Sequence, residues 1–274
     1  MRIAVPKETK QGEKRVALVP DIISKLTKAG LEVVIESKAG IAAEYSDQQF
    51  IDAGAQIKTG DVLTASDVVL SVQPLTVNQI KSLKKGAITI SFLSPTTAAD
   101  VIDAAVSAGV TAISLEMVPR ISRAQSMDAL TSQALCAGYK ASLVAAELSP
   151  KFFPLLMTAA GTVTPAKVVV LGAGVAGLQA IATAKRLGAV VSAYDVRPAS
   201  ADEVKSMGAK FITLELEALE GAGGYAREMT QERANKQREL LSPYIASADV
   251  LITTAAVPGR TAPMLVTAQM VSQM

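Results

Sequence analysis

Histidine is absent from the 274-residue chain, and cysteine occurs only once, as Cys136. Without histidine the chain has no histidine general base, no histidine-containing catalytic triad and no histidine metal ligand. No cluster of cysteine, aspartate and glutamate at ligand spacing replaces it, so the sequence predicts no bound metal. A single cysteine excludes an internal disulfide and is typical of a reducing compartment. We expect Cys136 to be a small buried hydrophobic residue.

The chain also has little that points to nucleic acid, export or a bilayer. The 27 Lys and Arg residues stand against 25 Asp and Glu residues, and the net charge of +2 is too balanced to favour a nucleic-acid partner. The N-terminal stretch lacks the long apolar core of a signal peptide. The longest weakly polar run, Val168–Ala184, is barely long enough to cross a bilayer and contains three glycines and Gln179. We interpret it as a buried strand, turn and helix, and expect a cytoplasmic protein without a membrane span.

What the chain has in abundance is small aliphatic residues: 50% of the residues are hydrophobic and only 4% are aromatic. Such a composition suits parallel sheets that helices bury on both faces. In the N-terminal half of the chain, β-branched runs alternate with helical patterns, several of which end at glycine. This alternation predicts an α/β fold with a doubly wound parallel sheet. We expect strands at Arg2–Val5, Glu32–Glu36, Asp67–Ser71, Ala87–Phe92 and Thr111–Leu115, and helices at Asp21–Ala29, Ser46–Ala53, Val77–Leu83 and Thr97–Ala108.

A second α/β unit begins near Lys167. Its expected elements are, in order, KVVVL, the helix Gly174–Leu187, AVVSAYD, the helix Ala201–Met207 and DVLITTA. An insertion, Thr213–Ser242, precedes the last strand, and its charged run REMTQERANKQREL is typical of a solvated helix face. The chain ends at VSQM, where a doubly wound sheet would need another strand. We therefore expect this domain to be truncated at its C-terminus.

The sequence thus predicts two Rossmann-like, doubly wound parallel-sheet domains separated by a cleft. The first, flavodoxin- or Rossmann-like, is expected to span residues 1–127. A longer helix pattern at 128–150 ends near Pro150 and is expected to connect the domains. The second, an incomplete Rossmann domain, is expected to span residues 151–274.

The second domain carries a dinucleotide-binding pattern. Gly172-Ala173-Gly174-Val175-Ala176-Gly177 fits G-x-G-x-x-G, with an apolar strand before it and an alanine-rich helix after it. In this pattern the first glycine permits a tight turn, the second lets the backbone approach a pyrophosphate, and the third lets the helix pack on the strand. The helix N-terminus then offers unpaired N–H groups to the phosphates. A merely structural glycine turn with a surface aspartate is the alternative interpretation.

The next strand ends in Asp195, eighteen residues after Gly177 and close to the spacing expected for the acidic residue that binds ribose. Asp195 would accept hydrogen bonds from the adenosine ribose hydroxyls and repel a 2′-phosphate, so the predicted cofactor is NAD(H) and not NADP(H). Val196 and Arg197 follow it and belong to the predicted cofactor site. Arg197 could meet a 2′-phosphate, but at such a strand end an arginine is more often solvated, and we expect Asp195 to dominate.

A polar cluster lies between a strand-like run and a helix-like run. The stretch PRISRAQSMDALTSQ, residues 119–133, places two arginines, an amide and a carboxylate within nine residues. Taken from the residues alone, Arg120 and Asp128 form either a binding site or an ordinary salt bridge, with a helix N-cap at Ser126 or Asp128.

Four segments in combination resemble a known family. They are RIAVPKETKQGEKRVALVP, PRISRAQSMD, MTAAGTVTPAKVVVLGAGVAGLQAIATAKRLGA and AGGYAREM. Together they look like the NAD(H)-binding domain I of proton-translocating nicotinamide nucleotide transhydrogenase, in the superfamily that includes alanine dehydrogenase. The resemblance implies direct hydride transfer between NAD(H) on this chain and NADP(H) on a partner domain, coupled to proton translocation by a membrane component. It also implies a homodimer, peripheral on the cytoplasmic side of the membrane.

The resemblance also implies roles for single residues. In the family, the loop that bears Arg120, Gln125 and Asp128 holds the nicotinamide end of NAD(H) in the cleft between the domains. By this resemblance Arg120 and Gln125 would bond the carboxamide and ribose side, and Asp128 would orient the arginine. Thr131, where serine is more usual, would assist. Tyr225 lies in the glycine-rich loop that closes over bound nucleotide in the family; on its own it would be interpreted as a linker tyrosine.

Two alternatives remain. Alanine dehydrogenases are similar around Arg15, which in them binds the substrate carboxylate, and they use a lysine in a V-K-E-P segment and a histidine after a later strand. The matching segments here are SVQP and LSPTT, and the chain has no histidine. An NAD-dependent alanine dehydrogenase-like enzyme would therefore lack that machinery, and Lys7, Glu8 and Arg15 would serve as stabilising contacts. The other alternative is an NAD-binding module without turnover.

Overall fold

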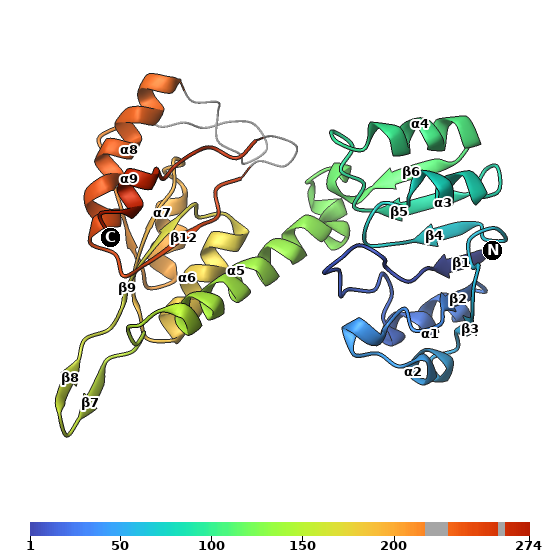
Figure 1. Ribbon diagram of the computed structural model, residues 1–274, viewed down its shortest axis with the longest axis horizontal. Coiled ribbons are helices and arrows are strands. Elements are labelled where there is room, and N and C mark those ends of the chain that lie inside the picture. Colours follow the sequence, from blue (N-terminus) through green and yellow to red (C-terminus); the bar gives the residue numbers. More distant parts are fainter. Residues whose placement is uncertain (217–229, 257–260) are drawn as a thin grey trace. The chain divides into compact units, whose positions relative to one another are not determined.

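A computed structural model of the chain describes residues 1–216, 230–256 and 261–274, which divide into two compact units, Met1–Asp128 and Ala129–Met274. Figure 1 shows that each unit is built from a sheet with helices around it. The helix expected to connect the domains over 128–150 is α5 (Ala129–Leu148), and it belongs to the second unit. Each of the two units is therefore an α/β unit with a parallel sheet, and α5 opens the second.

The first unit contains a parallel sheet with the strand order β3-β2-β1-β4-β5-β6. The order reverses between β1 and β4, because the chain first adds strands on one side of β1 and then returns to add the others on its opposite side. The strand β3 was not expected from the sequence. The strands are β1 (Arg2–Val5), β2 (Glu32–Glu36), β3 (Gln56–Lys58), β4 (Val68–Leu70), β5 (Ile88–Ser91) and β6 (Thr111–Ser114).

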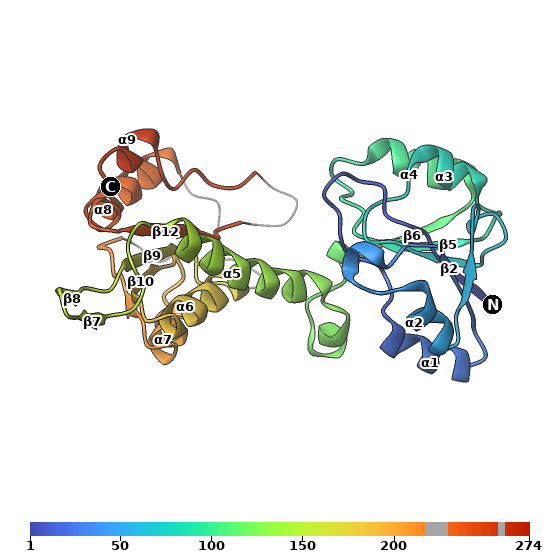
Figure 2. The same cartoon turned by 60° about the horizontal axis from the view of Figure 1, so that its bottom comes forward.

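Helices cover both faces of this sheet, as Figure 2 shows. Alternate residues of a strand point to opposite faces, so Ala4 and Val34 pack in the core with α3 (Val77–Ser82) and α4 (Ala99–Ala108). Their neighbours Val5, Val33 and Ile35 pack instead with α1 (Pro20–Lys28) and α2 (Asp47–Asp52). A sheet buried in this way on both faces explains the near-continuous apolar character of its strands.

Carboxylates tie the loop after β1 to the chain that follows β4. Glu13 accepts hydrogen bonds from Arg15 Nε at 2.8 Å and Arg15 Nη2 at 2.7 Å, and from Gln73 Nε2 at 2.7 Å. Glu8 accepts a bond from the backbone N–H of Val72 at 2.6 Å. The hydrogen bonds from Arg15 lower the pKa of Glu13 to about 2, whereas burial raises the pKa of Glu8. These contacts hold the crossing loop against the carboxyl end of the sheet.

The second unit has a parallel sheet in the order β11-β10-β9-β12. Its central strand β9 (Lys167–Leu171) pairs with β10 (Val190–Tyr194) on one side and β12 (Val250–Thr253) on the other. The outer strand β11 is short, Lys210–Phe211, and was not expected from the sequence.

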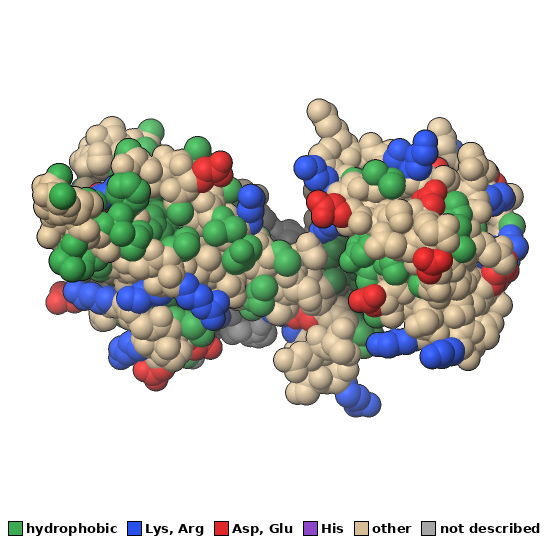
Figure 3. All heavy atoms as spheres, turned by 90° about the horizontal axis from the view of Figure 1, so that it is seen from below, with side chains coloured by type: hydrophobic (Ala, Val, Ile, Leu, Met, Phe, Trp, Pro, Cys, Tyr) green, Lys and Arg blue, Asp and Glu red, His purple; other side chains and the backbone are tan. Residues whose placement is uncertain are grey.

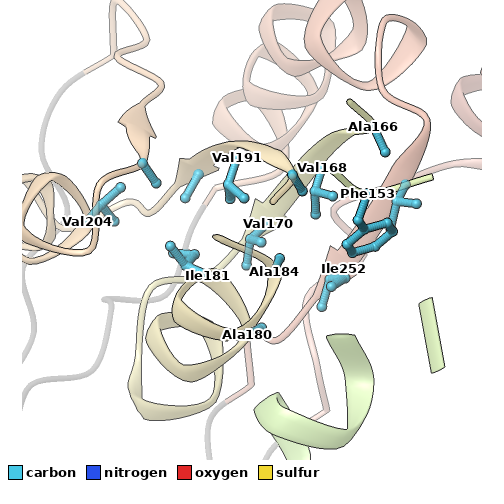
Figure 4. Packing of buried hydrophobic residues seen from close by; sticks show 14 of the residues in the cluster. Phe153, Ala166, Val168, Val170, Ala180, Ile181, Ala184, Val191, Val204 and Ile252 are labelled. Atoms are coloured by element: carbon cyan, nitrogen blue, oxygen red, sulfur yellow. The ribbon is translucent and has the colours of Figure 1, made fainter. Parts of the chain in front are cut away.

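Figure 4 shows the core on one face of this sheet, where Val168, Val170 and Val191 point toward α6 (Val175–Arg186). The helix α7 (Ser200–Ser206) contributes Val204 to the same core, and alanines of α5 pack at its border. The opposite face is covered by α8 (Gln231–Ala246) and α9 (Ala268–Val271).

Helix α8 agrees with the expectation of a solvated face, because most described residues of the charged run REMTQERANKQREL are exposed or half-buried. Three of its side chains, Gln237, Leu241 and Ile245, are buried, and they repeat every four residues along one face. The helix also continues past Ser242, where the expected insertion ended, to Ala246. Leu241 and Ile245 follow the charged run, so the run itself gives little sign of the buried face of the helix.

A hairpin formed by β7 (Leu156–Thr158) and β8 (Gly161–Val163) makes a separate antiparallel sheet of two strands. Phe152, Leu155 and Met157 in and before it are exposed, by 60%, 56% and 83%. Figure 3 shows that hydrophobic side chains are frequent on the visible face of the second unit. The hairpin was not expected from the sequence.

Helices α5 and α6 approach each other closely in the second unit. Gly138 of α5 lies against the first turn of α6: a Cβ at this position would be 2.0 Å from the carbonyl oxygen of Ala176. One turn later, the buried Ser142 donates a hydrogen bond from Oγ to the Ala180 carbonyl at 2.8 Å. Cys136 lies on the exposed side of α5, so the expectation that it is buried was wrong.

Gly138→Ala should destabilise the chain despite the greater helix propensity of alanine. The new methyl group forces α5 and α6 apart, and such overpacking costs roughly 1–3 kcal/mol. The free energy of unfolding, from urea denaturation monitored by circular dichroism, should fall by about 2 kcal/mol. Cys136→Ala, an exposed change on the same helix, is the matched control and should leave stability unchanged; equal stability of both variants would contradict the close packing.

Glu13→Gln should lower the stability of the chain at pH 7 by about 2 kcal/mol, because hydrogen bonds to a charged group are lost. The folded-state pKa of Glu13 is about 2, below the ordinary value of 4.5, so its contribution is present above pH 4.5 and is lost as the pH falls toward 2. The stability difference between wild type and variant should therefore shrink over this range. A constant difference from about pH 7 to about pH 3 would contradict the assignment, and Glu147→Gln on α5 is the control.

Candidate functional site

The turn that follows β9 is fixed to the end of the neighbouring strand β10. Gly172 adopts φ +98°, a conformation that residues with a Cβ rarely adopt, and its N–H donates to the Tyr194 carbonyl at 2.8 Å. The N–H of Ala173 donates to Oδ2 of Asp195 at 2.7 Å. The turn and the strand end that carry the predicted pyrophosphate and ribose contacts are therefore joined directly.

The other two glycines of the turn differ in what surrounds them. Gly177 is buried, and a Cβ there would lie 1.8 Å from the carbonyl oxygen of Gly172, so helix α6 starts directly against the turn. Gly174 is exposed, and no heavy atom of the described chain would lie within 4 Å of a Cβ on it. It is the N-cap of α6 and offers no side chain to the N–H groups of the first turn. The open space over Gly174 therefore lies beside the N–H groups of the first turn of α6. A pyrophosphate needs both, space for its oxygens and N–H groups that donate to them.

Thr254, at the end of β12, closes the turn from the other side of β9. Its Oγ1 donates to the Gly172 carbonyl at 3.0 Å. The same oxygen lies 2.9 Å from the positions that a Cβ would take at Gly172 and at Gly177. Thr254 was not among the residues expected from the sequence; its place at the end of the third parallel strand, DVLITTA, was the available signal.

Asp195 and Arg197 form a partly buried ion pair at the end of β10. The side chains are 8% and 25% exposed, and Arg197 Nε and Asp195 Oδ1 are 2.9 Å apart. Burial alone would raise the pKa of Asp195, but hydrogen bonds from Arg197 and from the N–H of Ala173 outweigh it and lower that pKa. Asp195 is therefore a carboxylate at neutral pH, which is the form that accepts hydroxyl hydrogen bonds. Val196 lies between the pair and packs at the border of the core under α8.

The predicted nicotinamide loop lies in the first unit, where two short 3₁₀ helices, η2 (Leu115–Met117) and η3 (Ser122–Met127), follow β6. Arg120 lies between them, and its Nε is 3.4 Å from Oδ2 of Asp128. The arginine side chain is 41% exposed and the aspartate 18% exposed. The loop is therefore closed by an ion pair that leaves a large part of the arginine side chain accessible.

Glu116 anchors the start of this loop. Its carboxylate accepts hydrogen bonds from the backbone N–H groups of Leu93 at 2.9 Å and Ser94 at 2.6 Å, and from Ser114 Oγ at 2.5 Å. Burial would raise the pKa of Glu116, but these bonds outweigh it and lower that pKa. The loop after β6 is thereby fixed to the end of β5. This residue was not expected from the sequence, because its backbone partners are more than twenty positions away.

Three further residues of the predicted site are Gln125, Thr131 and Tyr225. Gln125 is exposed on η3, and Thr131 is half-buried in the first turn of α5. Tyr225 lies outside the described residues. The structure brings Arg120 together with Asp128 in the first unit, and the glycine turn together with Asp195 and Arg197 in the second.

Comparison with known proteins shows which family the chain resembles. The family described as "Alanine dehydrogenase/PNT, N-terminal domain" matches residues 4–137, and "Alanine dehydrogenase/PNT, C-terminal domain" matches residues 141–274. An NAD(P) transhydrogenase subunit alpha polypeptide of Rhodospirillum rubrum is 47% identical over 284 residues, which cover 100% of this chain and 74% of the relative. The alanine dehydrogenase of Mycobacterium tuberculosis is 32% identical over 285 residues, covering 100% and 70%.

Solved structures agree with the sequence relatives. The transhydrogenase from Sinorhizobium meliloti matches with a TM-score of 0.89 at 42% identity, over 100% of this chain and 75% of that chain. The match extends over both units, including the glycine turn and the loop after β6. By family, relatives and structure alike, this chain belongs to the alanine dehydrogenase/PNT family.

Proposed function

We propose that this chain is the NAD(H)-binding component of a proton-translocating NAD(P) transhydrogenase. In this role it passes a hydride directly between its own NAD(H) and NADP(H) on a partner domain. The observation that carries the proposal is the turn before α6, where the open space over Gly174 meets the N–H groups of the helix start beside the Asp195 carboxylate. The proposal is supported by relatives named as NAD(P) transhydrogenase alpha subunits and by the similarity to a solved transhydrogenase.

The residues present fit NAD(H) at both ends of the turn. The N–H groups of the first turn of α6 would bind the pyrophosphate, and Gly174 lets the phosphates approach because it has no side chain. Asp195 would accept hydrogen bonds from the adenosine ribose and repel a 2′-phosphate. Ala173, Val175 and Ala176 would line the approach through their backbone alone.

The loop of the first unit is suited to orienting the nicotinamide. The cofactor itself supplies the hydride, so the protein needs to provide orientation and close approach and no acid or base. This agrees with a chain that contains no histidine. Arg120 and Gln125 would donate to the carboxamide and ribose, Asp128 would hold the arginine through their ion pair, and Thr131 would assist.

The partners follow from the same proposal. The relatives are named as subunits, which implies association with further transhydrogenase subunits. We propose that these supply the NADP(H)-binding domain and the membrane component that moves protons, and that the chain acts as a homodimer on the cytoplasmic side of the membrane. None of the helices in the described ranges is long and apolar enough to cross a bilayer.

An alanine dehydrogenase-like activity is the second candidate, favoured by relatives such as the Mycobacterium tuberculosis enzyme. Gln73 occupies the segment where those enzymes have lysine, and it donates to Glu13. NADH oxidation driven by pyruvate and ammonium would support this candidate. NADH binding without hydride transfer to any partner would favour a binding module without turnover.

Asp195→Asn should weaken NADH binding and remove discrimination against NADPH. Loss of a charged acceptor for the ribose hydroxyls costs roughly 1.5–3 kcal/mol, or about 10- to 100-fold in affinity. Isothermal titration calorimetry with NADH and NADPH measures both effects. Asp202→Asn, an exposed change on α7, is the control for charge. If wild type binds NADPH as tightly as NADH, the role given to Asp195 is wrong.

Arg120→Ala should slow hydride transfer and also weaken NADH binding, because the guanidinium donor to the carboxamide and ribose side is lost. A nicotinamide displaced by about 1 Å can lose up to about 100-fold in rate. The measurement is single-turnover reduction of an NADP analogue on the partner domain by NADH on this chain. Arg123→Ala, on the same loop and exposed, is the matched control. Equal rates for both variants would show that Arg120 has no part in positioning the ring.

A further inference from the structure

The carboxylate of Asp195 already has a full set of hydrogen-bond donors. Oδ1 accepts from the N–H of Arg197 at 2.9 Å and from Arg197 Nε at 2.9 Å. Oδ2 accepts from the N–H of Ala173 at 2.7 Å and from Arg197 Nη2 at 3.0 Å. A carboxylate offers about four acceptor positions. Ribose hydroxyls can therefore bond Asp195 only where another donor leaves.

The four donors differ in how easily they leave. The two backbone N–H groups belong to Ala173, in the turn before α6, and to Arg197, three residues past the end of β10, and neither can leave without a movement of the backbone. The guanidinium of Arg197 is attached to a flexible side chain that is 25% exposed. It is therefore the donor that an incoming ligand can displace without moving the backbone.

We propose that Arg197 competes with the adenosine ribose of NAD(H) for Asp195, and that the cofactor binds by displacing the guanidinium. This inference rests on the NAD(H) site proposed above and adds a residue that sets its affinity and specificity. The two donors of the guanidinium fork, Nε and Nη2, contact both carboxylate oxygens. The vicinal 2′- and 3′-hydroxyls of a ribose are likewise two neighbouring donors, so one pair can replace the other.

The displaced guanidinium has a second carboxylate nearby. Glu203 on α7 is exposed, and its charge contributes to the raised pKa of Arg197. The hydrogen bonds to Asp195 are the main cause of that raised pKa, and the charge of Glu203 would continue to favour the guanidinium while Asp195 receives the ribose. The exchange is nevertheless unfavourable for the cofactor, because a partly buried ion pair is broken.

Cofactor choice is affected as well as affinity. While the guanidinium lies on Asp195 it neutralises the negative charge that would repel a 2′-phosphate. When displaced, it is a donor that binds phosphate well. Arg197 therefore lowers the affinity for NADH and raises that for NADPH, so discrimination is smaller than Asp195 alone would give.

The test is calorimetric titration of wild type, Arg197→Met and Arg197→Lys with NADH and with NADPH. Arg197→Met should bind NADH about three- to tenfold more tightly, as the loss of one competing ion pair implies, and NADPH more weakly. Arg197→Lys keeps the positive charge but lacks the paired guanidinium donors Nε and Nη2. It should therefore also bind NADH more tightly than wild type, but by a smaller factor than Arg197→Met. Arg186→Met, at the end of α6, removes one positive charge elsewhere and is the control.

Unchanged or weaker NADH binding by Arg197→Met, relative to Arg186→Met, would overturn the proposal, because the guanidinium would then contribute to binding. If thermal unfolding shows that Arg197→Met is not folded, Arg197→Lys decides alone: unchanged or weaker NADH binding overturns the proposal. Failure of the proposed function gives a different result, because then wild type shows no saturable NADH binding and Asp195→Asn changes nothing. In that case the proposed competition is overturned as well.

Discussion

The position of helix α6 depends on backbone contacts that only glycine permits. On the side of the sheet, Gly177 brings the helix against the carbonyl oxygen of Gly172. On the side of α5, Gly138 brings the neighbouring helix against the carbonyl of Ala176. The first turn of α6 is therefore held between two elements with no side chain between the backbones. Its N–H groups gain a fixed direction, which a phosphate-binding turn needs more than it needs any particular side chain.

The first unit fixes its loops in a different way, through carboxylates. Glu116 binds backbone N–H groups at the end of β5, and Glu8 does the same after β4. Hydrogen bonds from backbone donors to a charged acceptor are stronger than neutral ones and set the path of the loop. Both carboxylates lie near the carboxyl ends of parallel strands, where α/β proteins place their functional loops. These carboxylates thus fix the loops of the first unit. In the proposed function the hydride comes from NAD(H) and not from a side chain.

Much of this architecture could be predicted from the sequence, because buried parallel strands are long β-branched runs and glycines mark the helix ends. The elements that were missed are short or lie at edges: β3, β11 and the β7–β8 hairpin have at most three residues per strand, too few for a pattern. The glycine turn and Asp195 could be proposed from the sequence because their signal is local. Thr254, Glu116 and Gly138 were not, because each acts on backbone atoms distant in the sequence.

The glycine turn is held by backbone packing, whereas the end of β10 is held largely by side chains. The two sites therefore differ in how readily their residues can be exchanged during evolution. A Cβ at Gly177 would collide with backbone atoms, so substitution there disturbs the helix, the strand and the turn together. Asp195 and Arg197 are two residues apart and meet through their side chains, and the Asp195 carboxylate also accepts the backbone N–H groups of Ala173 and Arg197 without a steric constraint of that kind. With the roles proposed for Asp195 and Arg197, descendants of such a chain would acquire a different nucleotide preference by exchanging these two residues, while the packing of α6 on β9 is inherited unchanged.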